Sequence, residues 1–179
     1  MKKLLLLPAI LIFAACSPVI TGFDYDKQAN FGKYKTYTIS EETMKMPLNQ
    51  LNRDRIISAV ETEMAAKGFT KSEIPDVILD IRIKGQEFQT ATATTTGPGY
   101  GFGYYRWGYG GGFSTTRVNY DKYVKGTTFV TLIDRATQKI VWQGTGTKTV
   151  DENASTEKRE ESINYTVKQI FANYPPKAK

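Results

Sequence analysis

The alternation between residues 77 and 84 is the feature that most constrains the fold of this chain. The apolar residues Val77, Leu79, Ile81 and Ile83 alternate with a mostly polar set at the even-numbered positions. Successive side chains of a strand point to opposite faces, so this pattern predicts a strand over residues 77–88 with one buried face. A sheet that is apolar on one face must be covered on that face by helices or by a second sheet.

Two segments have apolar residues at helical spacing and can supply this cover. They span residues 49–67 and residues 156–173. The stripes are Ile56, Ile57, Val60 and Met64 in the first segment and Ile163, Val167, Ile170, Phe171 and Tyr174 in the second. Gly68 is a natural stop for the first helix, and the two prolines at 175 and 176 end the second. Both segments are therefore predicted to be amphipathic helices.

The remaining periodic segments are short and have the character of strands. They cover residues 23–26, 34–39, 118–122, 127–134 and 139–144, with a turn over residues 134–137. The order is strand, strand, helix, four strands, helix. It predicts an α+β fold in which two amphipathic helices cover a largely antiparallel sheet of about five to six strands. We expect a single domain over residues 23–179.

The N-terminus is typical of a bacterial lipoprotein signal. Two lysines precede an apolar run over residues 4–15, which is too short to cross a bilayer but long enough for a secretory signal. The run ends in small residues before Cys16, the only cysteine of the chain. We expect a signal peptide over residues 1–15, lipidation (acylation such as palmitate) at Cys16, and a short tether over residues 16–22. Because Ser17 stands where an inner-membrane retention aspartate would stand, we expect the outer membrane, with the domain facing the periplasm.

Residues 97–113, GPGYGFGYYRWGYGGGF, combine eight glycines with seven aromatic residues. Rings alternate with glycines in two opposite phases, which predicts the tip of a long hairpin whose stems are the threonine-rich segments on either side. A plain glycine-rich surface loop is the alternative. If the loop has a role, its rings can contact a membrane interface, a glycan or a partner protein. The candidate contact residues are Tyr104, Arg106, Trp107 and Tyr109.

The residues needed for most catalytic chemistry are missing. The chain has no histidine, and its one cysteine is assigned to the lipid, so neither a histidine base nor a zinc–thiolate site is available. We expect no metal and no cofactor. Asp24 and Asp26 share one strand face but are interpreted as solvated. The formal net charge of +6 includes no dense basic run, so nucleic acid is not an expected partner.

Five blocks of sequence, taken in order, resemble one family of bacterial lipoproteins. They read FDYDKQANFGKYKTY, RIISAVETEMAAKGF, PDVILDIRIK, GTTFVTLIDRATQKIVWQG and YTVKQIFANYPP. The family is catalogued as domain of unknown function 4136. The resemblance covers nearly the whole chain after the signal and implies an exported α+β lipoprotein domain of undetermined role. It supplies no catalytic residues.

Three functions are consistent with these observations. The first is a non-enzymatic, lipid-anchored module of the cell envelope that binds a protein, a glycan or the membrane surface. The second is an enzyme that acts on envelope glycans through carboxylates, which would need two of them across a cleft. The third is a structural subunit that associates with itself through exposed strand edges and the hairpin.

Overall fold

The computed structural model describes residues 18–96 and 115–176 of the chain. The elements follow in the order β1 (Ile20–Tyr25), η1 (Phe31–Lys33), β2 (Thr36–Ile39), α1 (Glu41–Met44), α2 (Gln50–Ala66), β3 (Thr70–Lys71), β4 (Val77–Thr96), β5 (Thr115–Asp134), β6 (Ile140–Val150) and α3 (Thr156–Phe171). The α+β class predicted from the sequence is confirmed.

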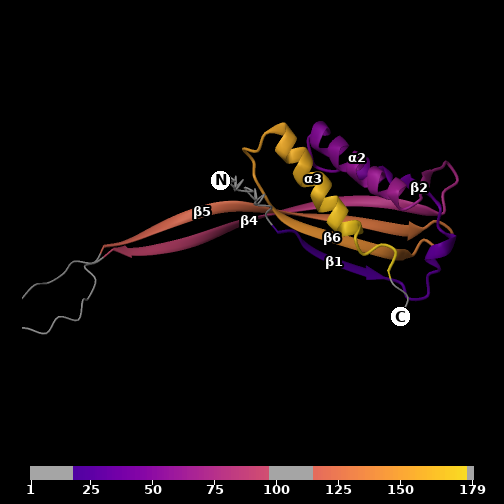
Figure 1. Ribbon diagram of the computed structural model, residues 1–179, viewed down its shortest axis with the longest axis horizontal. Helices are drawn as coiled ribbons and strands as arrows, with labels where there is room; N and C mark the ends of the chain where they lie inside the picture. Colours follow the sequence, from indigo (N-terminus) through magenta and orange to yellow (C-terminus); the bar gives the residue numbers. More distant parts are fainter. Residues whose placement is uncertain (1–17, 97–114, 177–179) are drawn as a thin grey trace, which may run out of the picture.

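The strands form one mixed sheet with the order β1-β6-β5-β4-β2-β3. The neighbours β1, β6, β5 and β4 pair antiparallel, whereas β2 pairs parallel to both β4 and β3. Figure 1 shows α2 and α3 on one face of this sheet, and no described element covers the other face. The described structure therefore has two layers, one of helices and one of strands, and the second face of the sheet is uncovered.

The described helices number three rather than the predicted two. The additional helix, α1, has a single turn that Ser40 caps by accepting from the backbone N–H of Thr43. The two longer helices lie where the periodicity places them. Asn49 caps α2, and Gly68 follows its end with a φ of 85°. So short an element as α1 carries no helical period, which is why the sequence does not predict it.

The predicted strands also merge into longer ones. The segments at 77–88 and 90–96 are one strand, β4, and the segments at 118–122 and 127–134 are one strand, β5. Gly126 looks like an interruption, but it is an ordinary paired position opposite Gly85. The predicted turn after β5 is confirmed, because the Asp134 carboxylate accepts from the backbone N–H groups of Ala136 and Thr137.

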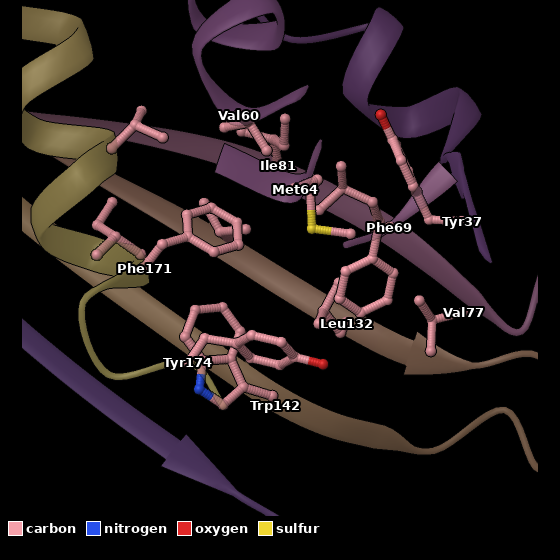
Figure 2. Packing of buried hydrophobic residues seen from close by; sticks show 14 of the residues in the cluster. Tyr37, Val60, Met64, Phe69, Val77, Ile81, Leu132, Trp142, Phe171 and Tyr174 are labelled. Atoms are coloured by element: carbon pink, nitrogen blue, oxygen red, sulfur yellow. The ribbon is translucent and has the colours of Figure 1, made fainter. Parts of the chain in front are cut away.

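The core lies between the sheet and the two long helices. Val77, Leu79 and Ile81 of β4 are fully buried, which confirms the buried face predicted from their alternation. Figure 2 shows the aromatic end of this core, where Trp142 of β6 meets Tyr174 beyond α3 at a ring-centroid distance of 5.2 Å and an angle of 80°. Of the predicted helix stripes, Ile57 and Ile163 are only partly buried, and the other members are buried: Ile56, Val60, Met64, Val167, Ile170, Phe171 and Tyr174.

Two glycines on β6 allow α3 to lie close to the sheet. A Cβ atom built on Gly146 would lie 2.8 Å from Cγ1 and 2.9 Å from Cδ1 of Ile170, which is closer than real Cβ contacts allow. Gly144 would meet the same isoleucine and the ring of Trp142. The absence of side chains at these two positions therefore sets the distance between helix and sheet.

Candidate functional site: a projecting two-stranded ribbon

The hairpin of β4 and β5 extends far beyond the rest of the sheet. The two strands pair without a register shift from Val77↔Asp134 to Thr96↔Thr115. Their neighbours end much earlier, β6 at Val124↔Val150 and β2 at Ile39↔Leu79. Beyond the Gly85↔Gly126 pair the structure is thus almost entirely a two-stranded ribbon, which Figure 1 shows projecting from the domain. From Gly85 to Thr96 it spans roughly 36 Å at about 3.3 Å per residue.

The local sequence explains why the strands continue so far. The outer half of β4 reads QEFQTATATTT, which is rich in threonine and contains neither proline nor glycine. β-branched residues favour extended backbone, and nothing in this segment interrupts the ladder. The threonine-rich stems predicted on either side of the glycine-rich segment are therefore confirmed as paired strands.

An aromatic pair with a cation beside it lies at the base of the ribbon. Phe88 and Tyr123 are directly opposite in the register, and their rings stack at a centroid distance of 5.6 Å with an angle of 14°. The ammonium group of Lys125 lies 5.1 Å from the Phe88 ring and 5.7 Å from the Tyr123 ring. Even-numbered β4 residues point away from the helices, so this cluster belongs to the open face of the sheet. Partly exposed rings beside a lysine can contact a protein, a sugar ring or an anionic group.

A groove lies on the helix-covered face of the sheet, near the base of the ribbon. It has a volume of about 510 Å³ and runs between α2 and α3, over the middle of β5 and the end of β6. Ile56, Ile83 and Ile163 make its apolar part, and Gly126 contributes no side chain to its floor. Its rim carries charges of both signs, from Lys148, Lys158 and Arg159 and from Asp151 and Glu152.

The carboxylate with the largest network lies at the other end of the sheet. Asp134 is 4% exposed and accepts hydrogen bonds from the Lys33 ammonium and the Tyr34 hydroxyl, both at 2.8 Å. The bond from Lys33, followed by the backbone N–H of Thr137, holds the pKa of Asp134 well below its usual range. A cleft of about 490 Å³ adjoins this cluster. Every contact of this carboxylate ties β5 to its turn or to the segment before β2, so its evident role is structural.

Three other carboxylates also accept hydrogen bonds from backbone N–H groups. Asp24 accepts from the N–H of Tyr25, and Asp26 from the N–H of Gln28. Asp76 accepts from the N–H groups of two residues at the start of β2, and these bonds lower the pKa of its carboxyl group. Among the residues that the structure describes, no group of three or more acidic, cysteine or histidine side chains could hold a metal ion.

The predicted site residues themselves fall outside the described part of the chain. Cys16 precedes it, and Tyr104, Arg106, Trp107 and Tyr109 lie in the gap between β4 and β5. The structure instead describes the stems that lead to that gap. Sequence reasoning missed the cluster of Phe88, Tyr123 and Lys125. An unbroken alternation on both sides of Gly85 and Gly126 could have placed Phe88 and Tyr123 opposite each other. Within the described residues, no helix has the length and apolar character needed to cross a bilayer.

The fold and the ribbon define the class of this protein as an α+β domain with a helix-covered sheet from which a long β-hairpin projects. The chain belongs to the family described as "Domain of unknown function (DUF4136)", which matches residues 22–176. This membership confirms the resemblance seen in the sequence. None of the curated proteins matches the chain.

Two solved structures are similar in outline. A PDZ domain protein from Parabacteroides distasonis has 16% sequence identity and a TM-score of 0.48, and the match covers 90% of this chain and 36% of that protein. A PelC dodecamer from Paraburkholderia phytofirmans has 12% identity and a TM-score of 0.48, covering 86% of this chain and 95% of that one. This chain thus spans about a third of the Parabacteroides protein. At this level of similarity, neither structure assigns a role to it.

Proposed function

We propose that this protein is an exported, lipid-anchored module of the bacterial cell envelope that acts by binding and not by catalysis, with the β4–β5 ribbon as its contact element. The observation that carries the proposal is the ribbon itself: in the described part of the chain, no third strand and no helix lies against its outer part. An isolated two-stranded hairpin is only marginally stable in water. A ribbon of this length therefore gains stability from a surface that covers it.

The anchor and the ribbon lie at the same end of the domain under this proposal. β1 begins with Ile20, which pairs with Thr147 close to the end of β6 where the ribbon departs. Four residue steps separate Cys16 from Ile20, a reach of at most about 14 Å. A lipid on Cys16 would hold the ribbon base near the bilayer surface, and we place that surface at the outer membrane, on its periplasmic side.

The segment between the two strands of the ribbon adds aromatic residues and a positive charge to the proposed contact surface. In this proposal, Tyr104, Arg106, Trp107 and Tyr109 meet the membrane interface or a membrane-bound partner, because tyrosine and tryptophan favour the interface and arginine attracts anionic groups. The cluster of Phe88, Tyr123 and Lys125 adds a second contact nearer the domain. Under this proposal, the ribbon and the segment that connects its two strands act together as one binding element.

Lipidation is tested by mass spectrometry of the processed protein purified from the envelope. We expect a mature chain that begins at Cys16 and carries acyl groups, and a Cys16→Ser variant that lacks them. A mature protein that starts elsewhere, or that carries no lipid, would contradict the anchor.

Ribbon contact is tested by photo-crosslinking in intact cells, with a photoreactive residue placed at Thr90 on the ribbon. The matched control carries it at Ala65, an exposed position on α2. We expect crosslinked products, identified by mass spectrometry, from Thr90 and not from Ala65. Equal yields from both positions would show that the ribbon is not the contact element.

The membrane contact is tested with a soluble chain that begins at Ser17, since every residue of the described core lies between Tyr34 and Tyr174. Wild type is compared with the triple variant Tyr104→Ala, Trp107→Ala, Tyr109→Ala for binding to anionic liposomes. We expect weaker binding of the variant and a blue shift of tryptophan fluorescence in the wild type. Equal binding without a shift would limit the contact to protein or glycan partners.

A further inference from the structure

We infer that the outer edge of β4 pairs with the same edge of a second copy of this chain, antiparallel and centred on Thr92, to form a dimer. The inference rests on the proposed role of the ribbon as the contact element and names its partner. Among the described residues, no strand pairs with this edge of β4 beyond Ile39↔Leu79.

The backbone groups that face the outer edge of β4 belong to its odd-numbered residues. The carbonyl of Leu79 accepts from the N–H of Ser40, and the N–H of Ile81 donates to Oγ1 of Thr43, both on the outer side. The β4–β5 ladder has no register shift, so this alternation continues along the strand. Gln89, Ala91 and Ala93 therefore direct their N–H and C=O groups away from β5, in the arrangement that an added strand requires.

The two edges of the ribbon differ in chemistry. Natural edge strands are protected from pairing by charged residues, prolines or bulges. Residues 115–123 of β5, which pair with residues 88–96 of β4, carry three charges in the sequence, at Arg117, Asp121 and Lys122. Residues 88–96 of β4 carry no charge, no proline and no bulge. The edge of β4 is thus the one that lacks protection against pairing.

The sequence of this edge is complementary to itself. In an antiparallel pair centred on Thr92, Thr90 lies opposite Thr94 of the second copy, and Ala91 lies opposite Ala93. Threonine pairs across strands are favourable, and Ala91 and Ala93 are the residues whose backbone groups point outward, so each such pair would exchange two hydrogen bonds. A register shifted toward the domain would bring Glu87 near its own copy, which like-charge repulsion disfavours.

The inferred dimer has a definite shape. Pairing the two edges joins the ribbons into one four-stranded sheet with a two-fold axis at Thr92. Because the strands are antiparallel, the domains lie at opposite ends. Gly85 of one copy and Gly85 of the other are then separated by fourteen residue steps, roughly 46 Å along the strands.

Disulfide formation at single cysteines tests the register. Both variants are made in the chain that begins at Ser17, so that the introduced cysteine is the only one. In the inferred register, Thr92 of one copy and Thr92 of the other form a non-hydrogen-bonded pair. Their Cα atoms would lie about 4.5 Å apart, a distance that a disulfide can bridge. Thr90 is the matched control, since its two copies are offset by four residues, roughly 13 Å. We expect Thr92→Cys to give a covalent dimer on mild oxidation, at a yield at least tenfold above Thr90→Cys.

Sedimentation across a concentration series tests the edge without cysteines. Ala91→Pro removes one outward N–H but no β4–β5 hydrogen bond, and Ala91→Val keeps the N–H and favours a strand. We expect wild type and Ala91→Val to dimerise and Ala91→Pro to remain monomeric, with unfolding transitions that coincide only at protein concentrations too low for dimerisation. Equal crosslinking of Thr90→Cys and Thr92→Cys, or a monomeric wild type, would overturn the inference. If Thr90 nevertheless crosslinked to another envelope protein in cells, the ribbon would keep its proposed role and only the second copy would be excluded.

Discussion

The close approach of α3 to β6 makes a quantitative prediction for a pair of substitutions, Gly146→Ala and Ile170→Ala. Ile170 is 1% exposed and lies over Gly146. Truncation to alanine removes three carbon atoms, worth about 0.8 kcal/mol each in transfer free energy, and leaves a cavity. We therefore expect Ile170→Ala to lower the free energy of unfolding by about 3 to 5 kcal/mol.

The glycine substitution acts in the opposite sense, by overfilling the same space. An alanine Cβ at position 146 would lie 2.8 and 2.9 Å from two side-chain carbons of Ile170, and 3.1 Å from Cγ2 of Thr166. Overpacking of this kind costs about 1 to 3 kcal/mol. The two carbons in closest contact are among those that Ile170→Ala removes. In the Ile170→Ala background the glycine substitution should thus cost little, which gives a coupling free energy of about 1 to 3 kcal/mol.

Urea denaturation followed by tryptophan fluorescence measures these values, because Trp142 is buried beside the substituted site. Gly126→Ala is the matched control. Its Cβ would meet Val150 and not Ile170, so its effect should add to that of Ile170→Ala. If Gly146→Ala and Ile170→Ala were also additive within about 0.5 kcal/mol, the glycine would not set the helix–sheet distance and the reasoning would be refuted.

Three further predictions concern the buried carboxylate of Asp134, the buried hydroxyl of Thr43 and the glycine that follows α2. The pKa of Asp134 is lowered in the folded state, so this carboxylate stabilises the fold at pH values above the ordinary aspartate pKa of about 3.9. The stabilisation is lost as the pH falls below that value, and Asp134→Asn should therefore flatten the pH dependence of the free energy of unfolding on the acid side. Thr43→Val leaves the buried N–H of Ile81 without its acceptor and should cost about 1 to 3 kcal/mol in urea denaturation, whereas Thr43→Ser, which keeps the hydroxyl, should cost less. Gly68→Ala should cost about 1 kcal/mol in thermal unfolding, purely from its φ of 85°, since nothing lies within 4 Å of the added Cβ; an unchanged melting temperature would show that the helix end adapts.

The periodic elements of this fold could be predicted from the sequence, and the aperiodic ones could not. Apolar residues at helical spacing located α2 and α3, and the alternation around Leu79 located the buried strand. The single turn of α1 and the two-residue strand β3 are too short to show a period. Their positions depend on contacts made after the chain has folded, such as the bonds between Thr43 and Ile81.

The site was predictable only in part, for a related reason. The threonine-rich stems indicated a hairpin, but the sequence alone could not show that the flanking strands end so early and leave it uncovered. That result depends on the registers Val124↔Val150 and Ile39↔Leu79, which are set by pairing between distant segments. Strand pairing over such separations leaves no local pattern in the sequence, whereas the glycine-rich tip is visible there by its composition alone.

If the chain is tethered through Cys16, as proposed above, the position of β1 has a mechanical consequence. β1 is an edge strand whose six residues, from Ile20 to Tyr25, each pair with β6. The hydrogen bonds of an antiparallel ladder are perpendicular to the strands. A pull on the tether along the strand axis would therefore load all six pairs together, in shear, and would pass directly to the central strands. A pull away from the edge would open the pairs one after another, beginning at Ile20, so the direction of the force would decide how firmly the domain is held.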